Sequence, residues 1–345
     1  MVKIFDQLRD ASSVSVQTLT YPSVDVATRR FNRATDTVRE GKLVKHQRRY
    51  AWATIVIPTA GMSIAVAQAI FVGVSIRDLS MCLVMYFLTL MGITVGFHRH
   101  LAHRSFKASA PVRLALAVLG SMATQGPVLH WVSNHRRHHK HSDQPGDPHS
   151  PNLYGEGVGA RVRGFCHAHI GSMFAPEVTN FMIYSPDLVR DRALMFVNRT
   201  YVWWVAFGVI APAVICGLLS MSWEGVLTGF LWGGLVRMFL VHHAIWSITS
   251  VAHMFGSKPY ESRDESRNSL PLALVTGGEG WHNNHHAFPS SALFTDRVWR
   301  IDIGGIVIRI LRAFGLVWDI HSVTPEMKAV KAARHSSDSS QKENR

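Results

Sequence analysis

Residues 51–76 read AWATIVIPTAGMSIAVAQAIFVGVSI, and this stretch contains no charged residue. At about 1.5 Å of rise per residue, a helix of this length crosses the roughly 30 Å hydrocarbon core of a bilayer. Pro58 lies inside the stretch, and membrane helices tolerate an internal proline. The stretch therefore predicts a membrane-spanning helix and sets the fold class of the whole chain.

Three further apolar runs have the length of a span. Residues 79–97 are uncharged and follow the first run after the short turn Arg77-Asp78. Residues 201–223 and 225–255 form another pair with a single residue between them. Spans joined by such short turns must be antiparallel neighbours. We therefore predict an all-α membrane protein with four spans in two hairpins.

The composition supports a membrane protein and argues against nucleic-acid binding. The chain is 47% hydrophobic and 17% charged, against about 25% charged residues in a typical soluble domain. Its net charge is +13, but the basic residues gather beside apolar runs, which favours a membrane surface as the partner. The three cysteines lie in apolar surroundings and form no disulfide framework, which favours a reducing compartment.

Basic residues gather before the first span, which orients the chain under the positive-inside rule. These residues are Arg29, Arg30, Arg33, Arg39, Lys42, Lys45, Arg48 and Arg49. With four spans, both termini and the connection from residue 98 to residue 199 face the cytoplasm. We expect the protein in a bacterial inner membrane, or in the endoplasmic reticulum if the source is eukaryotic.

Outside the spans, the sequence predicts three kinds of segment. Residues 1–49 form a cytosolic arm, residues 50–325 the membrane domain, and residues 326–345 a disordered polar tail. Residues 110–124 are apolar but short and carry Arg113, which predicts an interfacial or buried helix.

Histidines are concentrated in three clusters on the predicted cytoplasmic side. His-x-x-His-His occurs at residues 135–139 and again at 282–286, and this spacing places three imidazoles on one helix face. His98 and His103 follow the second span, and His253 lies near the end of the fourth. So many converging imidazoles indicate transition metals, and one ion cannot use them all. On an ideal α-helix His98 and His103 point about 140° apart, so they either meet across the curve of the helix or ligate different metals.

The motifs around these histidines resemble those of the membrane fatty acyl desaturases, of the stearoyl-CoA (Δ9) type including its bacterial members. The matching segments are 96–106, 134–140 and 278–289. The resemblance implies four helices under a cytosolic helical cap with a cytoplasmic active site. It also implies a di-iron centre held by nine histidines. They are His98, His103, His135, His138, His139, His253, His282, His285 and His286.

The resemblance also implies roles for residues around the metal. An asparagine that reaches one iron through water in the family is replaced here by Thr249, whose hydroxyl can still hold a water. The residues expected to bind substrate are Trp131, Trp246, Asn134 and Gly126. Gly126 and Asn134 replace an asparagine and an aspartate of the animal enzymes, which predicts a different acyl head group. The residues expected around the ligands are Asp147, His149, His169 and Glu279.

The reaction implied is the oxygen-dependent insertion of a cis double bond, at Δ9, into a C16 or C18 acyl chain. Dioxygen is the co-substrate, and the acyl carrier is coenzyme A, a carrier protein or a lipid. The sequence contains no Gly-x-Gly-x-x-Gly loop, haem-attachment motif or iron–sulfur cysteine cluster. A separate electron donor is therefore expected, either cytochrome b5-like or ferredoxin-like with its reductase.

Two other functions fit part of the pattern. A fatty acyl or alkane hydroxylase would use the same di-iron scaffold and retain an oxygen atom in its product. A metal transporter or storage protein would place polar ligands through the middle of the bilayer. The histidines lie instead toward one face of the membrane, which disfavours transport.

Overall fold

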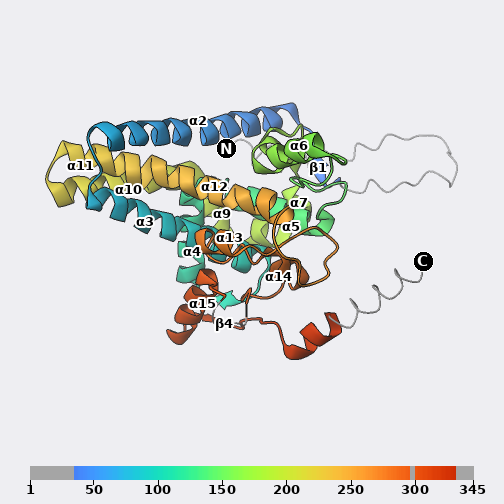
Figure 1. Ribbon diagram of the computed structural model, residues 1–345. Helices are drawn as coiled ribbons and strands as arrows, with labels where there is room; N and C mark the ends of the chain where they lie inside the picture. The colour runs from blue at the N-terminus through green and yellow to red at the C-terminus, as the bar shows by residue number, and fades with distance from the viewer. Residues whose placement is uncertain (1–34, 296–299, 332–345) are drawn as a thin grey trace, which may run out of the picture.

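The computed structural model describes residues 35–295 and 300–331. Long helices lie side by side, with the tips of both hairpins at one end and the shorter helices α5, α6, α7 and α14 at the other (Figure 1). Within the described residues, four helices are long and apolar enough to cross a membrane. The predicted all-α architecture with four spans is confirmed.

The first hairpin consists of α2 (Gly41–Phe71) and α3 (Ile76–Met91), and α3 continues as the π-helix η2 (Gly92–Ala102). The predicted turn at Arg77-Asp78 is wrong, because the chain turns at residues 72–75. Gly73 adopts a φ of 93° there, which glycine reaches without strain. Ser75 then caps α3 by accepting a hydrogen bond from the Asp78 amide at 3.1 Å.

The second hairpin begins with α10 (Tyr201–Ser220). The chain then returns as one continuous apolar helix, Trp223–His253. This helix comprises α11 (Trp223–Thr228), η4 (Gly229–Val236), α12 (Arg237–Ser250) and η5 (Val251–His253). The limits of both predicted spans therefore shift by a few residues, while the pairing holds.

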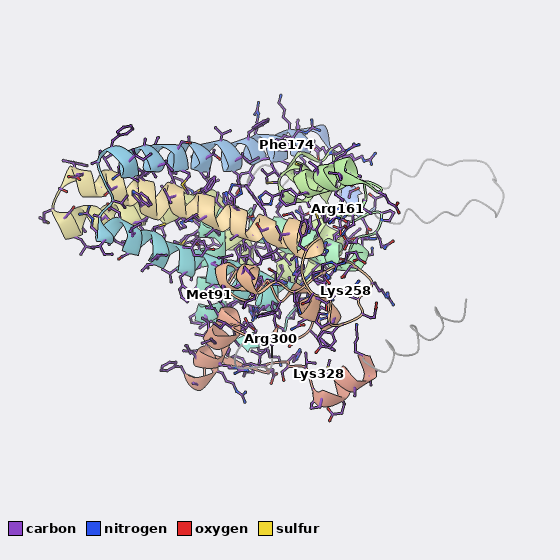
Figure 2. All side chains as sticks on the ribbon, viewed as in Figure 1. Met91, Arg161, Phe174, Lys258, Arg300 and Lys328 are labelled. Carbon is purple, nitrogen blue, oxygen red and sulfur yellow. The ribbon has the colours of Figure 1, made fainter. Side chains whose placement is uncertain are left out.

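Short elements complete the molecule and gather mostly at one end of the long helices. They are α4 (Ala110–Met122), α5 (Val128–His141), α6 (Val158–His169), η3 (Gly171–Phe174), α7 (Phe181–Tyr184), α8 (Pro186–Arg190), α9 (Arg192–Arg199), α13 (Leu270–Val275), α14 (His282–Ala287) and α15 (Ile303–Ala313). Strand β1 (Thr37–Val38) pairs with β3 (Val178–Thr179), and β2 (Lys107–Ala108) pairs with β4 (Val317–Trp318), both antiparallel. The charged side chains of Arg161 and Lys258 lie at this end of the molecule (Figure 2).

Helix α4 is the short apolar helix expected near residues 110–124, and it packs against the spans. Its final carbonyl groups are held by two buried side chains of α12. Arg237 donates to Met122 O at 2.8 Å, and His242 Nε2 lies 3.1 Å from Ala123 O. Arg237 also donates to Gly208 O at 2.6 Å. The buried guanidinium thus satisfies a carbonyl at the end of α4 and the Gly208 carbonyl within α10, whose usual partner four residues on is Pro212 and has no N–H.

The predicted terminal segments fall mainly outside the described residues. Residues 1–34 and 332–345 carry most of the expected arm and tail. Within the described part, α2 begins ten residues before the predicted span, and residues 325–331 are helical. Basic side chains can extend a membrane helix beyond the apolar stretch, which explains the early start of α2.

Candidate metal centre

The π-helix η2 brings His98 and His103 to the same face. The His103 amide donates to the His98 carbonyl at 3.0 Å, which is the five-residue hydrogen bond of a π-turn. The wider turn removes the angular offset of an α-helix, and the two ring centroids lie 4.9 Å apart. The prediction that the two residues meet only across the helix curve, or serve different metals, is therefore wrong.

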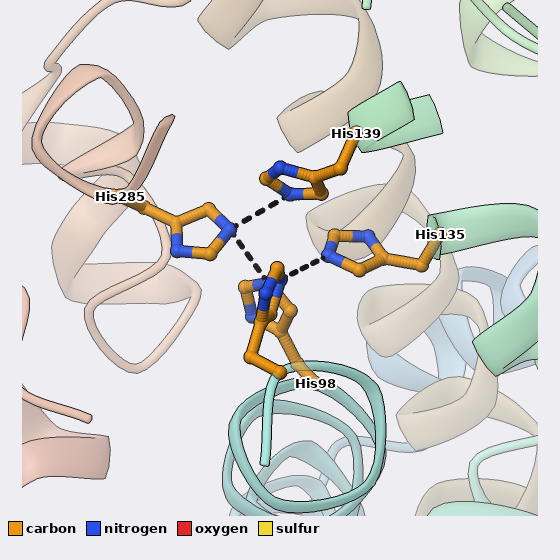
Figure 3. A group of neighbouring side chains, drawn as sticks. His98, His135, His139 and His285 are labelled. Atoms are coloured by element: carbon orange, nitrogen blue, oxygen red, sulfur yellow. Dashed lines mark hydrogen bonds between the residues drawn. The ribbon is translucent and has the colours of Figure 1, made fainter. Parts of the chain in front are cut away.

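Five imidazoles converge in one group, called here the five-histidine group. Its members are His98, His103, His135, His139 and His285, whose ligand atoms all lie within 4.8 Å of one another. Figure 3 shows the rings of His98, His135, His139 and His285 pointing toward a common centre. They come from η2, α5 and α14, three segments far apart in sequence.

Four more imidazoles form a second cluster, called here the four-histidine group. Its members are His138, His253, His282 and His286, again with ligand atoms within 4.8 Å of one another. The rings of His138 and His139 point to different groups, although the residues are adjacent in α5. The structure therefore divides all nine predicted histidines between two sites.

The outer nitrogens of four rings are held by carboxylates, one in the five-histidine group and three in the four-histidine group. The Nδ1···O distances are 2.6 Å for His98–Glu279, 2.9 Å for His138–Asp147, 2.9 Å for His253–Asp143 and 2.7 Å for His286–Asp264. A carboxylate on Nδ1 orients the ring and leaves Nε2 for a metal. Glu279 and Asp147 were predicted around the ligands, whereas Asp143 and Asp264 were not.

Burial keeps most of these rings neutral, as metal ligands must be. Burial and then the charges of neighbouring imidazoles lower the pKa of several rings well below its usual value: those of His135, His139, His282 and His285. The same causes lower the pKa of His103 to about 3. For Asp147, burial alone would raise the pKa, but the charge of His138 and its hydrogen bond lower it below the usual range.

The residues present fit metal ions. Adjacent Nε2 atoms stand 3.0 Å apart in His98–His285 and in His253–His282. Two ligands about 2.1 Å from one ion and at right angles to each other would be about 3 Å apart. Among the described residues, the buried Nε2 of His286 has no hydrogen-bond partner. An all-imidazole set of donors suits iron, copper, nickel or zinc.

Two cavities adjoin the histidine groups. A small one of about 40 Å³ is lined by His98, His138 and His282 together with apolar side chains. A large one of about 580 Å³ is lined by Arg39 and by residues of α2 and α5. Trp131 and Thr249 border both cavities, and Trp131 stacks on His135 with centroids 5.1 Å apart.

Of the other three residues predicted to bind substrate, two line the large cavity and the third, Gly126, lies just before α5. Trp246 and Asn134 line the large cavity. The Asn134 side chain is already bonded within the protein, since its oxygen accepts from Thr179 Oγ1 at 2.5 Å. Gly126 lies in the turn before α5 with a φ of 105°, and its amide donates to the Tyr201 hydroxyl.

His149 and His169 occupy different surroundings. The His149 ring stacks on His138 with centroids 4.6 Å apart, and its amide donates to Asp147. His169 instead lies against α12, where Nδ1 is 2.9 Å from Ser250 Oγ and Nε2 is 3.1 Å from His243. The structure thus places His149 beside the four-histidine group and directs both nitrogens of His169 toward the last span.

Two metal-competent histidine groups on a four-span helical scaffold agree with a comparison of the whole sequence. The fatty acid desaturase family model matches residues 79–294. The chain belongs to the fatty acid desaturase family. Together with the four apolar helices, this membership identifies it as an integral membrane protein.

Relatives within the fatty acid desaturase family differ in chemistry and in carrier. The chain is 45% identical to a hex-5-enoyl-[acyl-carrier protein] acetylenase from Moorena producens, over 80% of the chain and 87% of the relative. It is 35% identical to an sn-1 stearoyl-lipid 9-desaturase from Synechocystis sp., over 78% and 80%. It is 36% identical to an acyl-CoA C20 Delta5-desaturase from Anemone leveillei, over 66% and 69%.

Proposed function

We propose that the protein is an oxygen-dependent fatty acyl desaturase whose nine histidines hold two iron ions, one in each group. The observation that carries the proposal is the division of nine imidazoles, five from buried residues and four from half-buried ones, into two convergent sets beside a cavity. The iron ions would supply the oxidation of an unactivated C–H bond, which no side chain can perform. Membership of the desaturase family supports this choice of metal.

The chain's own residues would orient the substrate and keep water out. Trp131, Ile245 and Ile248 line the small cavity beside the histidines, and they offer an apolar surface to adjacent methylene groups. The carboxylates behind His98, His138, His253 and His286 fix the ring orientations. Thr249, in place of the family's asparagine, faces the same cavity and can hold a water.

The reaction consumes dioxygen and needs two electrons from outside the acyl chain. Removing two hydrogens from the chain supplies two electrons, and full reduction of dioxygen to water takes four. We propose that a separate cytochrome b5-like or ferredoxin-like protein, with its reductase, supplies the other pair on the cytoplasmic side. The basic residues at the start of α2 support a cytoplasmic cap, with both termini on that side. The membrane would be a bacterial inner membrane, or the endoplasmic reticulum in a eukaryote.

The expected position of attack is Δ9 in a C16 or C18 chain. The relatives named stearoyl-lipid 9-desaturases support this position. The Anemone relative, a Delta5-desaturase, and the Moorena acetylenase support attack nearer the carboxyl end. All of these choices use the same removal of two hydrogens from adjacent carbons.

A second candidate function is acetylenase activity, favoured by the 45% identity to the Moorena enzyme. Removing two hydrogens from an existing double bond gives a triple bond. A hydroxylase on the same scaffold remains an alternative, whereas metal transport or storage is disfavoured because the ligands gather at one end of the spans.

The test is turnover by the purified, iron-loaded protein with dioxygen, a reductase and an electron carrier. Mass spectrometry separates the outcomes, because an olefin loses two mass units, an alkyne loses four and an alcohol gains sixteen relative to a saturated acyl chain. Olefin that requires both dioxygen and iron is the expected result. An alcohol as the sole product would replace the desaturase proposal by the hydroxylase, and a product formed without dioxygen would refute both.

A further inference from the structure

The carboxylates behind the two histidine groups are unevenly distributed. In the four-histidine group, three of the four rings have a carboxylate oxygen within 2.9 Å of Nδ1, and these carboxylates belong to Asp143, Asp147 and Asp264. In the five-histidine group, only His98 has such a partner among the described residues, namely Glu279 at 2.6 Å. The two groups therefore offer similar imidazoles with different charges behind them.

The three aspartates of the four-histidine group are buried and held in place. Their side chains are at most 7% exposed, so water and salt screen their charges little. Asp147 accepts a hydrogen bond from the Asp143 amide at 2.9 Å, and Asp143 accepts one from the Glu265 amide at 2.8 Å. Asp264 accepts one from the Ser266 amide at 3.1 Å. Such donors fix each carboxylate and favour its charged form.

The one carboxylate of the five-histidine group lies beside a buried cation. Arg99 is fully buried, with Nε 3.5 Å from Glu279 Oε1, and it forms a 2.8 Å ion pair with Asp302. Its guanidinium lies 3.8 Å from the centre of the Phe294 ring, which packs against His285 with centroids 4.7 Å apart.

The net charge behind the two groups therefore differs. The two carboxylates and one guanidinium behind the five-histidine group carry −1 together, whereas the three aspartates behind the four-histidine group carry −3. Among the described residues, no lysine or arginine forms an ion pair with those three aspartates. The four-histidine group is thus the more negative of the two surroundings.

This difference acts on ferric and ferrous iron unequally. A carboxylate that accepts from the Nδ1–H of a ring increases the basicity of that ring as a ligand. Negative charge also stabilises the ion with the larger positive charge, and it does so more strongly where water is excluded. Both effects favour ferric iron and lower the reduction potential. The additional imidazole of the five-histidine group is neutral and contributes no such charge.

We propose that the two irons have unequal reduction potentials, lower in the four-histidine group, and that Asp143, Asp147 and Asp264 set the difference. The inference rests on the two irons of the function proposed above and adds an order of reduction to it. One electron from the external carrier would convert ferric to ferrous iron in the five-histidine group, and a second would do so in the four-histidine group. The aspartates act through the rings that they contact, so they are positioning residues.

The test is stepwise anaerobic reduction of the full-length, iron-loaded protein, followed by Mössbauer spectroscopy. His103→Ala disrupts the five-histidine group and His282→Ala the four-histidine group, so these variants assign the two signals. After one electron per protein, we expect ferrous iron in the five-histidine group and ferric iron in the four-histidine group. The ferric-to-ferrous ratios of the two groups should differ at least tenfold, which is about 59 mV for one electron. The reverse order, or equal reduction of both groups, would overturn the inference.

Asparagine in place of aspartate keeps the shape of the side chain and removes its charge. Asp264→Asn should lower the ferric-to-ferrous ratio of the four-histidine group about tenfold at a fixed potential and leave the five-histidine group unchanged. Glu279→Gln should do the reverse. The matched control is Asp36→Asn, because the Asp36 carboxylate lies 2.9 Å from His141 Nε2 and His141 belongs to neither group. This control should leave both ratios at their wild-type values.

Iron content, measured on each variant, separates a shifted potential from a lost metal. An Asp264→Asn protein that keeps both irons and the wild-type ratios would refute the role of the aspartates. If that variant loses iron, the order of reduction in the wild-type protein decides the matter alone.

The inference and the desaturase proposal can fail separately. Olefin formed by a protein whose two irons are reduced together would refute the unequal potentials and leave the desaturase intact. Potentials in the expected order, with no olefin or alkyne from any acyl substrate in the presence of dioxygen and electron donor, would refute the desaturase proposal and leave the inference intact.

Discussion

The His103 amide donates to the His98 carbonyl at 3.0 Å, and this one hydrogen bond places two imidazoles in the same metal-competent group. An α-helix would have directed them to different sides. π-Turns are frequent at functional sites because the extra residue in the turn redirects side chains. The geometry of η2 therefore determines which histidines belong to the same group.

Replacement of His103 by alanine should remove one of the two irons and spare the other. The reason is that His103 belongs to the five-histidine group, while the four-histidine group keeps all its members. Elemental analysis should show about half the iron of the wild type, and Mössbauer spectra should retain one of two signals. Loss of all iron with the fold intact would mean that the two sites are not independent.

Ligands and neighbouring histidines should behave differently on substitution. His138→Ala and His285→Ala remove one member of each group and should lower product formation at least 100-fold while the protein still inserts into membranes. His141→Ala is the control, because His141 Nε2 is bonded to Asp36 at 2.9 Å and belongs to neither group. Its activity should stay within about threefold of wild type. Product analysis on the three variants, at equal expression, tests the division.

The spans could be predicted from the sequence because three of the four apolar runs carry no charge and the fourth carries only Arg237. The turn between the first two spans could not be placed correctly, since Arg77-Asp78 is the only charged interruption between the two apolar runs. Two local signals mark residues 72–75 instead. Ser75 caps α3 by accepting from the Asp78 amide, and Gly73 adopts a positive φ.

The candidate site was predictable in membership and less so in geometry. Repeated His-x-x-His-His spacing identifies imidazoles that face one way, but an ideal α-helix gives the wrong direction for His98 and His103. Asp143 and Asp264 were missed because they reach His253 and His286 from loops. Loop carboxylates carry no periodic signal, so their partners appear only in three dimensions.

Arg136 should contribute more to the free energy of unfolding than Arg104, which pairs with the same carboxylate. Arg136 donates to Leu101 O at 2.7 Å and to Ala102 O at 3.0 Å, the last carbonyls of η2, and pairs with Asp187. Arg104 pairs with the same carboxylate from a side chain that is 64% exposed.

Arg136→Met should therefore lower the free energy of unfolding by about 2–3 kcal/mol, through lost charge-assisted hydrogen bonds. It should also deplete iron from the five-histidine group. Arg104→Met should cost less than about 1 kcal/mol. Thermal unfolding in detergent and iron content measure both effects. Equal destabilisation by the two changes would show that pairing with Asp187, rather than support of η2, is what matters.

Thr249 tests whether a hydroxyl can replace the family's asparagine. Its Oγ1 lies 3.0 Å from Ala168 O and 3.0 Å from Trp246 O, so its proton is used and its lone pairs can accept from a water in the adjoining cavity. Thr249→Val keeps the shape and should lower turnover about tenfold, whereas Thr249→Asn should preserve or raise it. Turnover of the valine variant equal to that of the wild type would exclude a supporting role for the hydroxyl.

The position of the double bond should be measured from the carboxyl end of the acyl chain. The large cavity adjoins the histidine groups, so a head group held in it would fix the distance between the acyl carbonyl and those groups, whatever the length of the acyl chain beyond them. Expression in a desaturase-deficient host, fed saturated acids of several lengths, supplies the products, and mass spectrometry after derivatisation locates each double bond. The expected outcome is one constant position across all chain lengths, at Δ9 if the stearoyl-lipid relatives are the better guide and nearer the carboxyl end if the Moorena relative is. A bond at constant distance from the methyl end would contradict anchoring at the carboxyl end, because the fixed point would then lie at the other end of the chain.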